Sequence, residues 1–314
     1  MARGRWRRVT AVGATVGVIA GLAAPAAPAA PDCPGGPAEV RTLLTGQGTL
    51  ESVIVDRNGR LFFTNDDSLL RLDRPDGEPR VLAQVSGPGG LAFDDQGNVI
   101  VGYGNTVANG TVGDLTGPSG LLRVDPDTGT AEVYATGLSM ANGLVRGPDG
   151  SYYASNDFGS NIDRIQDGQT ERGWAKVDSG NGLAIDTSGR YLYVAQTFRP
   201  AAIQRVELAH PENVNEYVRA DLEDMTAGLD GMARDDADRL FVAANGAGQI
   251  WRVDRDPPTI CVLLRGLPAF PDGPSAVATG SRRGPFPARN IYVVTFNGDL
   301  IELVDVAVSS KRHR

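Results

Sequence analysis

The chain has little cysteine and little histidine, and this excludes several kinds of active site. Its 314 residues include two cysteines, Cys33 and Cys261, and two histidines, His210 and His313. Because no Cys-x-x-Cys pair or Cys/His cluster occurs, the sequence does not support a zinc or thiol-redox site. His210 lies in a polar connection and His313 in the C-terminal tail, so neither a histidine dyad nor a Ser-His-Asp triad is expected.

Long apolar runs are absent from most of the chain, and one short run stands near the N-terminus. Residues 1–30 begin with four arginines among the first eight residues and continue with an uncharged apolar run over 9–24. The letters APAAPAAP then offer small-x-small cleavage sites near Ala29 or Ala30. This order is typical of a secretory signal peptide, so we expect a secreted protein with no membrane association after cleavage. A retained anchor is the alternative, although the run is short for a membrane span.

Basic residues are in the minority. The chain has 30 Lys and Arg against 38 Asp and Glu. The predicted signal peptide contains four of the arginines, so the net charge of the mature chain after cleavage is about −12. Such a surface repels nucleic acid and anionic lipid, and we therefore expect neither as a partner. The basic tail, residues 309–314, is too short to reverse this and is interpreted as a frayed terminus.

Linkers and low-complexity segments are also missing between Pro34 and Val308, which favours a single domain over residues 31–308.

In an exported protein the two cysteines can form a disulfide that ties the mature N-terminus to a distant strand. The alternative is a pair of unpaired thiols.

A sequence repeat extends through the whole predicted domain. Six segments share one pattern, a short strand, a tight turn and a second strand: ESVIVDRNGRLFFTN (51–65), GGLAFDDQGNVIVGY (89–103), NGLVRGPDGSYYASN (142–156), NGLAIDTSGRYLYVAQ (181–196), DGMARDDADRLFVAAN (230–245) and SAVATGSRRGPFPARNIYVVTF (275–296). Most continue into a third and a fourth strand, and the period is about 40 to 50 residues. Four strands per repeat predict an all-β, six-bladed β-propeller. The last copy lacks a clear fourth strand, so Ala38–Leu44 is expected to supply it and close the ring. An all-β sandwich is the alternative.

The first residue of each repeat occupies an equivalent place. These residues are Glu51, Gly89, Asn142, Asn181, Asp230 and Ser275. The first strand of every propeller blade lines the central channel, so the six are expected at one height around it. Two carboxylates and two amides suit a hard cation such as calcium, which takes six to eight oxygen ligands. Without a cation the two carboxylates would repel each other.

A simpler interpretation of the same residues remains open. Asn-Gly and Asp-Gly are common hairpin-turn dipeptides, and each could merely connect two blades. Their equivalent positions, with Glu51 at the same place in a non-turn context, favour the channel site. The glycine after Asn142, Asn181 and Asp230 would let the backbone approach closely at the channel.

At these segments the chain resembles the family of regucalcin and gluconolactonase, and more distantly diisopropylfluorophosphatase and the paraoxonases. The most specific pieces are MANGLVRGPDGSYYASND, GNGLAIDTSGRYLYVAQT and GLDGMARDDADRLFVA, and the resemblance covers residues 49–305. It implies a six-bladed propeller with one divalent cation, usually calcium, in the channel, and hydrolysis of lactones or related esters. The family's metal ligands fall on Glu51, Asn142, Asn181 and Asp230.

Two departures from the family pattern are visible. Its usual Glu-Gly-Pro opening is here Glu51-Ser52-Val53, and Met140 replaces the substrate-binding arginine. The second departure argues against sugar lactones more than against the metal. By analogy with the family, Asp230 would serve as general base or as nucleophile.

Substrate contacts are expected from loops on the metal-ligand face of the ring. The candidates are Arg199, which could meet an anionic substrate, and Asn156, Asp157, Asn245 and Phe296, which follow second strands. The Gly- and Asn-rich segment 102–120 is interpreted either as a mobile lid or as a disordered insertion.

The function expected from these patterns is an exported, calcium-dependent hydrolase acting on a small-molecule lactone or ester. Two alternatives remain. One is a non-catalytic propeller that the metal stabilises and that binds a partner. The other is a biosynthetic propeller similar to strictosidine synthase, which does not use this metal set.

Overall fold

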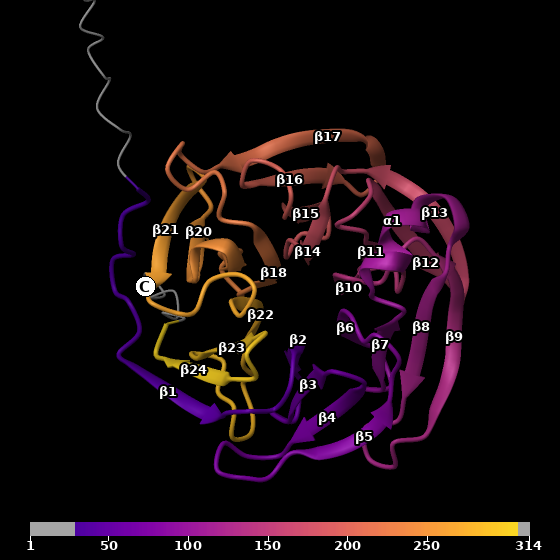
Figure 1. The fold of residues 1–314 in the computed structure, drawn as a ribbon, viewed down its shortest axis with the longest axis horizontal. Helices are drawn as coiled ribbons and strands as arrows, with labels where there is room; N and C mark the ends of the chain where they lie inside the picture. The colour runs from indigo at the N-terminus through magenta and orange to yellow at the C-terminus, as the bar shows by residue number, and fades with distance from the viewer. Residues whose placement is uncertain (1–28, 307–314) are drawn as a thin grey trace, which may run out of the picture.

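The computed structural model describes residues 29–306 and shows six four-stranded antiparallel sheets arranged around a central channel (Figure 1). The predicted all-β, six-bladed propeller is therefore confirmed. Within each sheet the strands follow chain order from the channel outward, except in the last blade. The structure does not describe residues 1–28 and 307–314, so the predicted signal peptide (residues 1–30), apart from Ala29 and Ala30, and the predicted basic tail (residues 309–314) lie outside the described residues.

The strand bounds are as follows. The first strands, which line the channel, are β2 (Leu50–Val55), β6 (Leu91–Phe93), β10 (Leu144–Arg146), β14 (Gly180–Ile185), β18 (Leu229–Arg234) and β22 (Pro274–Thr279). The second strands are β3 (Leu61–Asn65), β7 (Val99–Tyr103), β11 (Tyr152–Ser155), β15 (Tyr191–Gln196), β19 (Leu240–Ala244) and β23 (Ile291–Thr295). The third strands are β4 (Ser68–Leu72), β8 (Ser119–Val124), β12 (Asn161–Gln166), β16 (Ala202–Glu207), β20 (Gln249–Asp254) and β24 (Leu300–Val304). The outer strands are β5 (Arg80–Gln84), β9 (Ala131–Leu138), β13 (Gln169–Lys176), β17 (His210–Arg219), β21 (Thr259–Leu264) and, in blade six, β1 (Glu39–Leu44).

The N-terminal strand closes the ring, as expected. β1 pairs antiparallel with β24, from Glu39 opposite Val304 to Leu44 opposite Leu300. The last blade therefore combines the two ends of the domain, and the backbone of β24 gains partners on both sides. This removes an open sheet edge at the point where the circle begins and ends.

The core is divided among the interfaces between blades. Six clusters of buried apolar side chains occur in the described residues, and each joins two neighbouring blades. For example, Phe62 of blade one packs in the same cluster as Val99 of blade two. Because alternate residues of each strand face opposite neighbours, every blade is covered on both sides. The ring is thus stabilised all the way round, and the channel strands are held rigidly.

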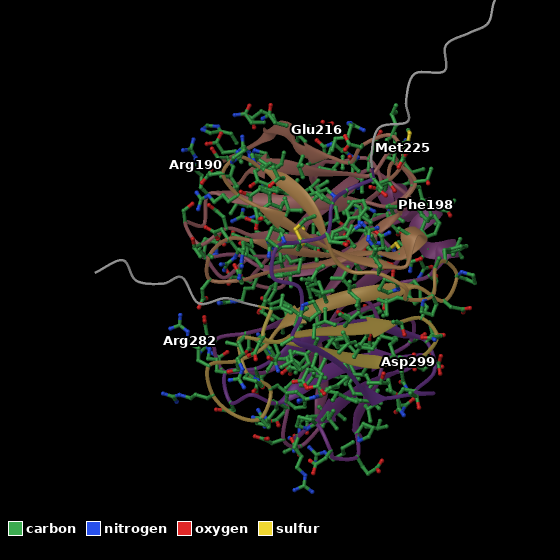
Figure 2. The ribbon with its side chains drawn as sticks, turned by 90° about the vertical axis from the view of Figure 1, so that its left-hand side faces the viewer. Arg190, Phe198, Glu216, Met225, Arg282 and Asp299 are labelled. Carbon is green, nitrogen blue, oxygen red and sulfur yellow. A yellow bond between two sulfur atoms is a disulfide. The ribbon has the colours of Figure 1, made fainter. Side chains whose placement is uncertain are left out.

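The ring has two distinct faces. Turns between first and second strands lie on one face, called the lower face, with Arg190 and Arg282 at the left of Figure 2. Turns between second and third strands lie on the opposite face, called the upper face, with Phe198 at the right of Figure 2. On the lower face aspartates fix the turns: Asp56, for instance, accepts hydrogen bonds from the amides of Asn58 and Arg60 at 2.9 and 2.8 Å. The upper face carries the beginnings of the channel strands.

The two cysteines are joined in a disulfide, Cys33–Cys261, with Cα atoms 4.8 Å apart. The first of the two alternatives for this pair is therefore correct. The segment around Cys33 runs beside β21, where its amide donates to Val262 O at 2.8 Å. Ala30 is buried nearby, and its amide donates to Asp224 Oδ2 at 2.8 Å. The N-terminal segment is thus fastened to blade five before β1 joins blade six.

Segment 102–120 contains an ordered helix, α1 (Val107–Thr116), between β7 and β8. Neither interpretation made from its glycine content, a mobile lid or a disordered insertion, anticipated this helix. Thr106 caps its N-terminus by accepting from the Asn109 amide, and Gly117 ends it at φ 62°. Gly113 is buried, and a Cβ there would lie 1.8 Å from Ser139 O, so a larger residue would not fit. The helix glycines thus serve close packing on blade three. No helix in residues 29–306 has the length and apolar character needed to span a membrane.

Candidate active site

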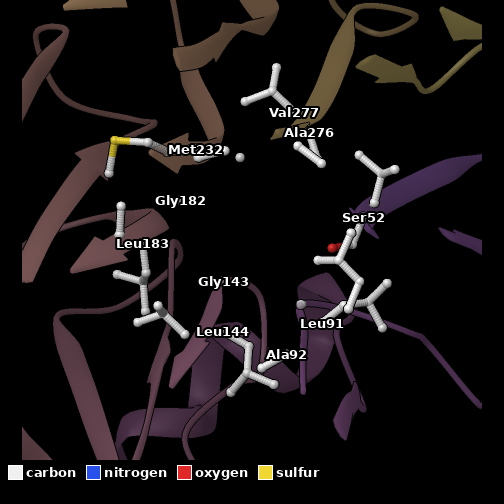
Figure 3. A pocket seen from close by; sticks show the side chains of 18 of the residues that line it. Ser52, Leu91, Ala92, Gly143, Leu144, Gly182, Leu183, Met232, Ala276 and Val277 are labelled. Carbon is white, nitrogen blue, oxygen red and sulfur yellow. The ribbon is translucent and has the colours of Figure 1, made fainter. Parts of the chain in front are cut away.

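Two cavities follow one another along the channel. The lower cavity, of about 330 Å³, is lined by residues of the first strands such as Leu91, Leu144 and Met232 (Figure 3). The upper cavity, of about 560 Å³, is lined by residues of the upper-face loops. Four residues line both cavities and so mark the junction: Glu51, Asn142, Asn181 and Asp230. These are the four predicted metal ligands, and the fold brings them together.

Glycine follows Asn142, Asn181 and Asp230, and close packing of the backbone explains why these positions require glycine. A Cβ at Gly143 would lie 2.2 Å from Asn181 O, and one at Gly182 would lie 2.3 Å from Asp230 O. Each glycine therefore lets its strand approach the backbone of the next blade at the height of the ligand ring. The repeated Asn-Gly and Asp-Gly pairs are part of the channel wall and not simple hairpin turns.

The other two ring positions do not contribute ligand side chains. Gly89 has no side chain, and its amide donates to Gly102 O at 3.0 Å. Ser275 is buried, and its hydroxyl donates to Leu50 O at 2.5 Å, which ties blade six to blade one. The ring is therefore asymmetric, with oxygen-bearing groups from blades one, three, four and five.

Two further residues complete the polar floor of the upper cavity. Asn105 lies just beyond β7 and donates from Nδ2 to Glu51 Oε1 at 2.9 Å. Asp157 follows β11 and is 6% exposed. Asp157 Oδ1 and Asn105 Oδ1 are buried and have no hydrogen-bond partner within residues 29–306. Asp157 was expected only at the mouth, and Asn105 was missed because its segment was interpreted as a lid or insertion.

The three carboxyl groups of this floor have raised pKa values. Burial raises the pKa of Glu51 to about 7, and the nearby Asp157 adds to the rise. Burial raises the pKa of Asp157 to about 6, against a hydrogen bond from Asn142 that lowers it. The pKa of Asp230 lies well above its ordinary range because of burial and because Glu51 and Asp157 are close. Full ionisation of these three groups at neutral pH, without a cation, therefore costs free energy.

The donor set fits a hard divalent cation. All the groups that face the junction offer oxygen: carboxylates from Glu51, Asp157 and Asp230 and amide oxygens from Asn142 and Asn181. The buried oxygen atoms without partners are the kind of donor that a cation would satisfy. Within residues 29–306 no three His, Cys, Asp or Glu side chains form a metal cluster by themselves. A cation here would therefore depend on the asparagines as well as on the carboxylates.

The predicted substrate contacts divide into two groups. Asn245 and Phe296 line the upper cavity, as expected. Asn156 does not line it: this side chain is buried and donates to Gly110 O and to Asp114 Oδ1, both at 2.9 Å, so it holds α1 in place. Arg199 does not line it either; the side chain is exposed and pairs with Asp178 at 3.3 Å. Its turn instead presents Thr197 and Phe198 to the cavity.

Among the residues that the structure describes, no histidine lines this site. His210 is exposed at the start of β17, the outer strand of blade four, and its nearest charged partner is Glu212 at 3.5 Å. The expectation that His210 is a solvated residue is confirmed. His313 lies outside the described residues.

Comparison with known proteins gives one family and many solved propellers. The family described as SMP-30/Gluconolactonase/LRE-like region matches residues 155–262, which include Asp157, Asn181 and Asp230. No curated protein matches the chain. A gluconolactonase from Xanthomonas campestris is 18% identical, with a TM-score of 0.63 over 89% of this chain and 98% of the other. Regucalcin from Agrobacterium tumefaciens, a calcium-binding protein, is 18% identical, with a TM-score of 0.66 over 84% and 93%.

The same fold also occurs with other chemistry. A virginiamycin B lyase from Staphylococcus aureus is 15% identical, with a TM-score of 0.58 over 85% of this chain and 99% of the other. At such identities the structural likeness establishes the fold alone, and function has to be argued from the site. The chain is a six-bladed β-propeller, and its predicted resemblance to the regucalcin and gluconolactonase family is confirmed, with residues 155–262 as the part that matches the family.

Proposed function

We propose that the protein is a divalent-cation-dependent hydrolase of lactones or related esters. The observation that carries this proposal is the floor of the upper cavity, where Glu51, Asp157 and Asp230 converge beside buried oxygens that have no partner. The match to the SMP-30/gluconolactonase family, and the likeness to a gluconolactonase and to a calcium-binding regucalcin, support the same activity.

Calcium is the cation that we propose, and Glu51, Asn142, Asn181 and Asp230 are the residues that would hold it. Their uniformly oxygen donors match the preference of calcium better than that of a softer metal. When bound, the cation would polarise the substrate carbonyl and make a nearby water more acidic. Asn105, through its hydrogen bond, would keep the Glu51 carboxylate oriented toward the junction.

Asp230 is the proposed general base. Burial and the neighbouring carboxylates, which raise the pKa of Asp230 in the cation-free site, would oppose the lowering of that pKa by a bound cation, so the carboxylate would stay basic enough to accept a proton. Asp230 would accept a proton from the attacking water while the water oxygen bonds to the acyl carbon. The acyl C–O bond then breaks, and the leaving alkoxide takes up that proton, which gives a hydroxy acid from a lactone. A role as nucleophile, with an acyl intermediate on Asp230, is the variant suggested by the family resemblance.

We expect hydrolysis of simple lactones and aryl esters with calcium and no hydrolysis in EDTA. The measurement is kcat/KM over a panel of lactones with the purified protein in each condition. Binding calcium at 100 times its Kd should also stabilise the fold by about 2.7 kcal/mol. Glu51→Gln is expected to weaken both effects because it removes one proposed ligand. Stabilisation by calcium without turnover would favour a non-catalytic binding propeller, and no calcium effect at all would contradict the proposed site.

We also propose that the protein is exported. The signal pattern in residues 1–30 and the Cys33–Cys261 disulfide support this, because disulfides persist in oxidising compartments. Mass spectrometry of the protein from the culture medium is expected to give a chain that begins near Ala30 and has no free thiol. A full-length chain retained in the cytosol with two reduced cysteines would contradict export.

A further inference from the structure

The upper cavity has an apolar wall above its acidic floor. Six lining residues are aliphatic or aromatic and come from separate loops of the upper face: Val107, Met140, Phe158, Phe198, Phe270 and Phe296. Phe270 is 73% exposed and Phe198 is 54% exposed. Figure 2 shows Phe198 at the edge of the upper face. Exposed apolar side chains that gather around one cavity indicate a binding surface.

The side chains of this apolar wall contact one another and are supported by the fold. The rings of Phe158 and Phe198 are in contact, with centroids 5.1 Å apart and an interplanar angle of 42°. Helix α1 packs against Phe158 and Met140: a Cβ at Gly110 would lie 2.7 Å from Met140 Sδ and 2.9 Å from Phe158 Cδ2. The helix in turn is held by Asn156 through Gly110 O. The fold therefore supports the apolar wall from behind.

The charges of the cavity are all negative. Glu51, Asp157 and Asp230 are its only charged lining residues, and no Lys, Arg or His among the described residues lines it. One divalent cation would still leave a negative charge if all three carboxylates are ionised, so an anionic substrate would be repelled. Polar groups such as Thr197 and Asn245 also line the cavity, but the hydroxyl groups of a polyhydroxylated substrate that face the phenylalanine rings would find no hydrogen-bond partner there.

We infer that the substrate is a neutral, hydrophobic lactone or ester, with its carbonyl at the acidic floor and an alkyl or aryl group against Phe158 and Phe198. This inference rests on the proposed hydrolase activity and narrows its substrate class. Because the ring of the lactone reacts at the floor, the appended group extends along the apolar wall toward the mouth. Binding then comes mainly from burial of that group.

The test compares γ-butyrolactone, γ-nonalactone and D-glucono-δ-lactone with calcium present. Each methylene that the wall buries should raise kcat/KM about fourfold until the wall is covered, so γ-nonalactone is expected to exceed γ-butyrolactone by well over tenfold. Phe198→Ala and Phe158→Ala should each reduce kcat/KM for γ-nonalactone by about tenfold and reduce that for γ-butyrolactone much less. Leu115→Ala is the control, because Leu115 lies on α1 outside the cavity and is 84% exposed.

The outcomes separate this inference from the activity on which it rests. A preference for D-glucono-δ-lactone, or equal kcat/KM for the short and the long lactone, would overturn the substrate class while the hydrolase proposal stands. An equal loss in the Phe198→Ala and Leu115→Ala variants would also overturn it, since a general effect on folding would then explain both. Hydrolysis of none of these compounds, nor of phenyl acetate, would overturn the hydrolase proposal and the substrate class with it.

Discussion

Replacing Asp230 by asparagine is expected to reduce kcat/KM for the best lactone by about 10³-fold while the propeller stays folded. A general base typically contributes 10²- to 10⁴-fold, and this change removes the base and one of the proposed ligands together. Asparagine has nearly the same shape, so the close contact between Gly182 and the Asp230 backbone is unaffected. The measurements are steady-state kinetics with calcium and far-UV circular dichroism of both proteins.

The thermal stability of this variant gives a second check on the same residue. In EDTA, Asp230→Asn is expected to raise Tm, because it removes one of three carboxylates that repel one another in a buried site. Asp178→Asn is the matched control, since Asp178 is exposed and pairs only with Arg199 on the upper face. Full activity in Asp230→Asn, or equal losses in both variants, would contradict the role assigned to Asp230.

Stability of the cation-free protein is expected to fall as pH rises from about 4.5 to 7. Burial raises the pKa of Glu51 from 4.5 to about 7 and that of Asp157 from 3.8 to about 6. In this window the unfolded chain has released these protons and the folded protein still holds them, so each rise in pH favours unfolding. Each shift corresponds to about 3 kcal/mol of unfolding free energy. This contribution is lost progressively as pH rises and is completely lost above pH 7. Urea denaturation in EDTA at pH 5, 6, 7 and 8 measures the slope.

Calcium and a double variant test the cause of this slope. Calcium should stabilise the protein far more at pH 8 than at pH 5, because it binds the ionised carboxylates. Glu51→Gln combined with Asp157→Asn should reduce the slope; Asp230 and Asp163, whose pKa values burial also raises, keep the rest of it. Carboxyl groups whose pKa values are lowered, such as Asp149, lose their protons below their ordinary range in the folded protein and therefore do not produce a fall in stability as pH rises. An unchanged slope in the double variant would show that other groups cause it.

Much of the fold and of the candidate site could be predicted from the sequence because of the repeat. Strand, turn and strand recur within each unit, so the blades, their order and the closing strand β1 followed from local patterns and period. The same register placed Glu51, Asn142, Asn181 and Asp230 at one height, and all four line the channel junction. In a repeat fold, position within the unit determines position in space, which is why these residues could be found without the structure.

Residues outside the repeated register could not be found in this way. Asn105 and Phe270 lie in loops of different length, so no count along the sequence places them. Arg199 is next to Phe198 in the chain, yet only Phe198 reaches the cavity, because adjacent residues of a turn point in different directions. The glycines of segment 102–120 suggested flexibility, but they permit close packing of a helix on blade three.

By itself the sequence determined the six blades and the oxygen-rich ring, since both depend on contacts repeated within and between neighbouring units. Only the tertiary structure decided that Asp157 and Asn105 join that ring, that Cys33 bonds to Cys261, and that an apolar wall stands above the acidic floor. These features bring together side chains from separate blades, far apart in the chain, and their proximity exists only once the ring has closed.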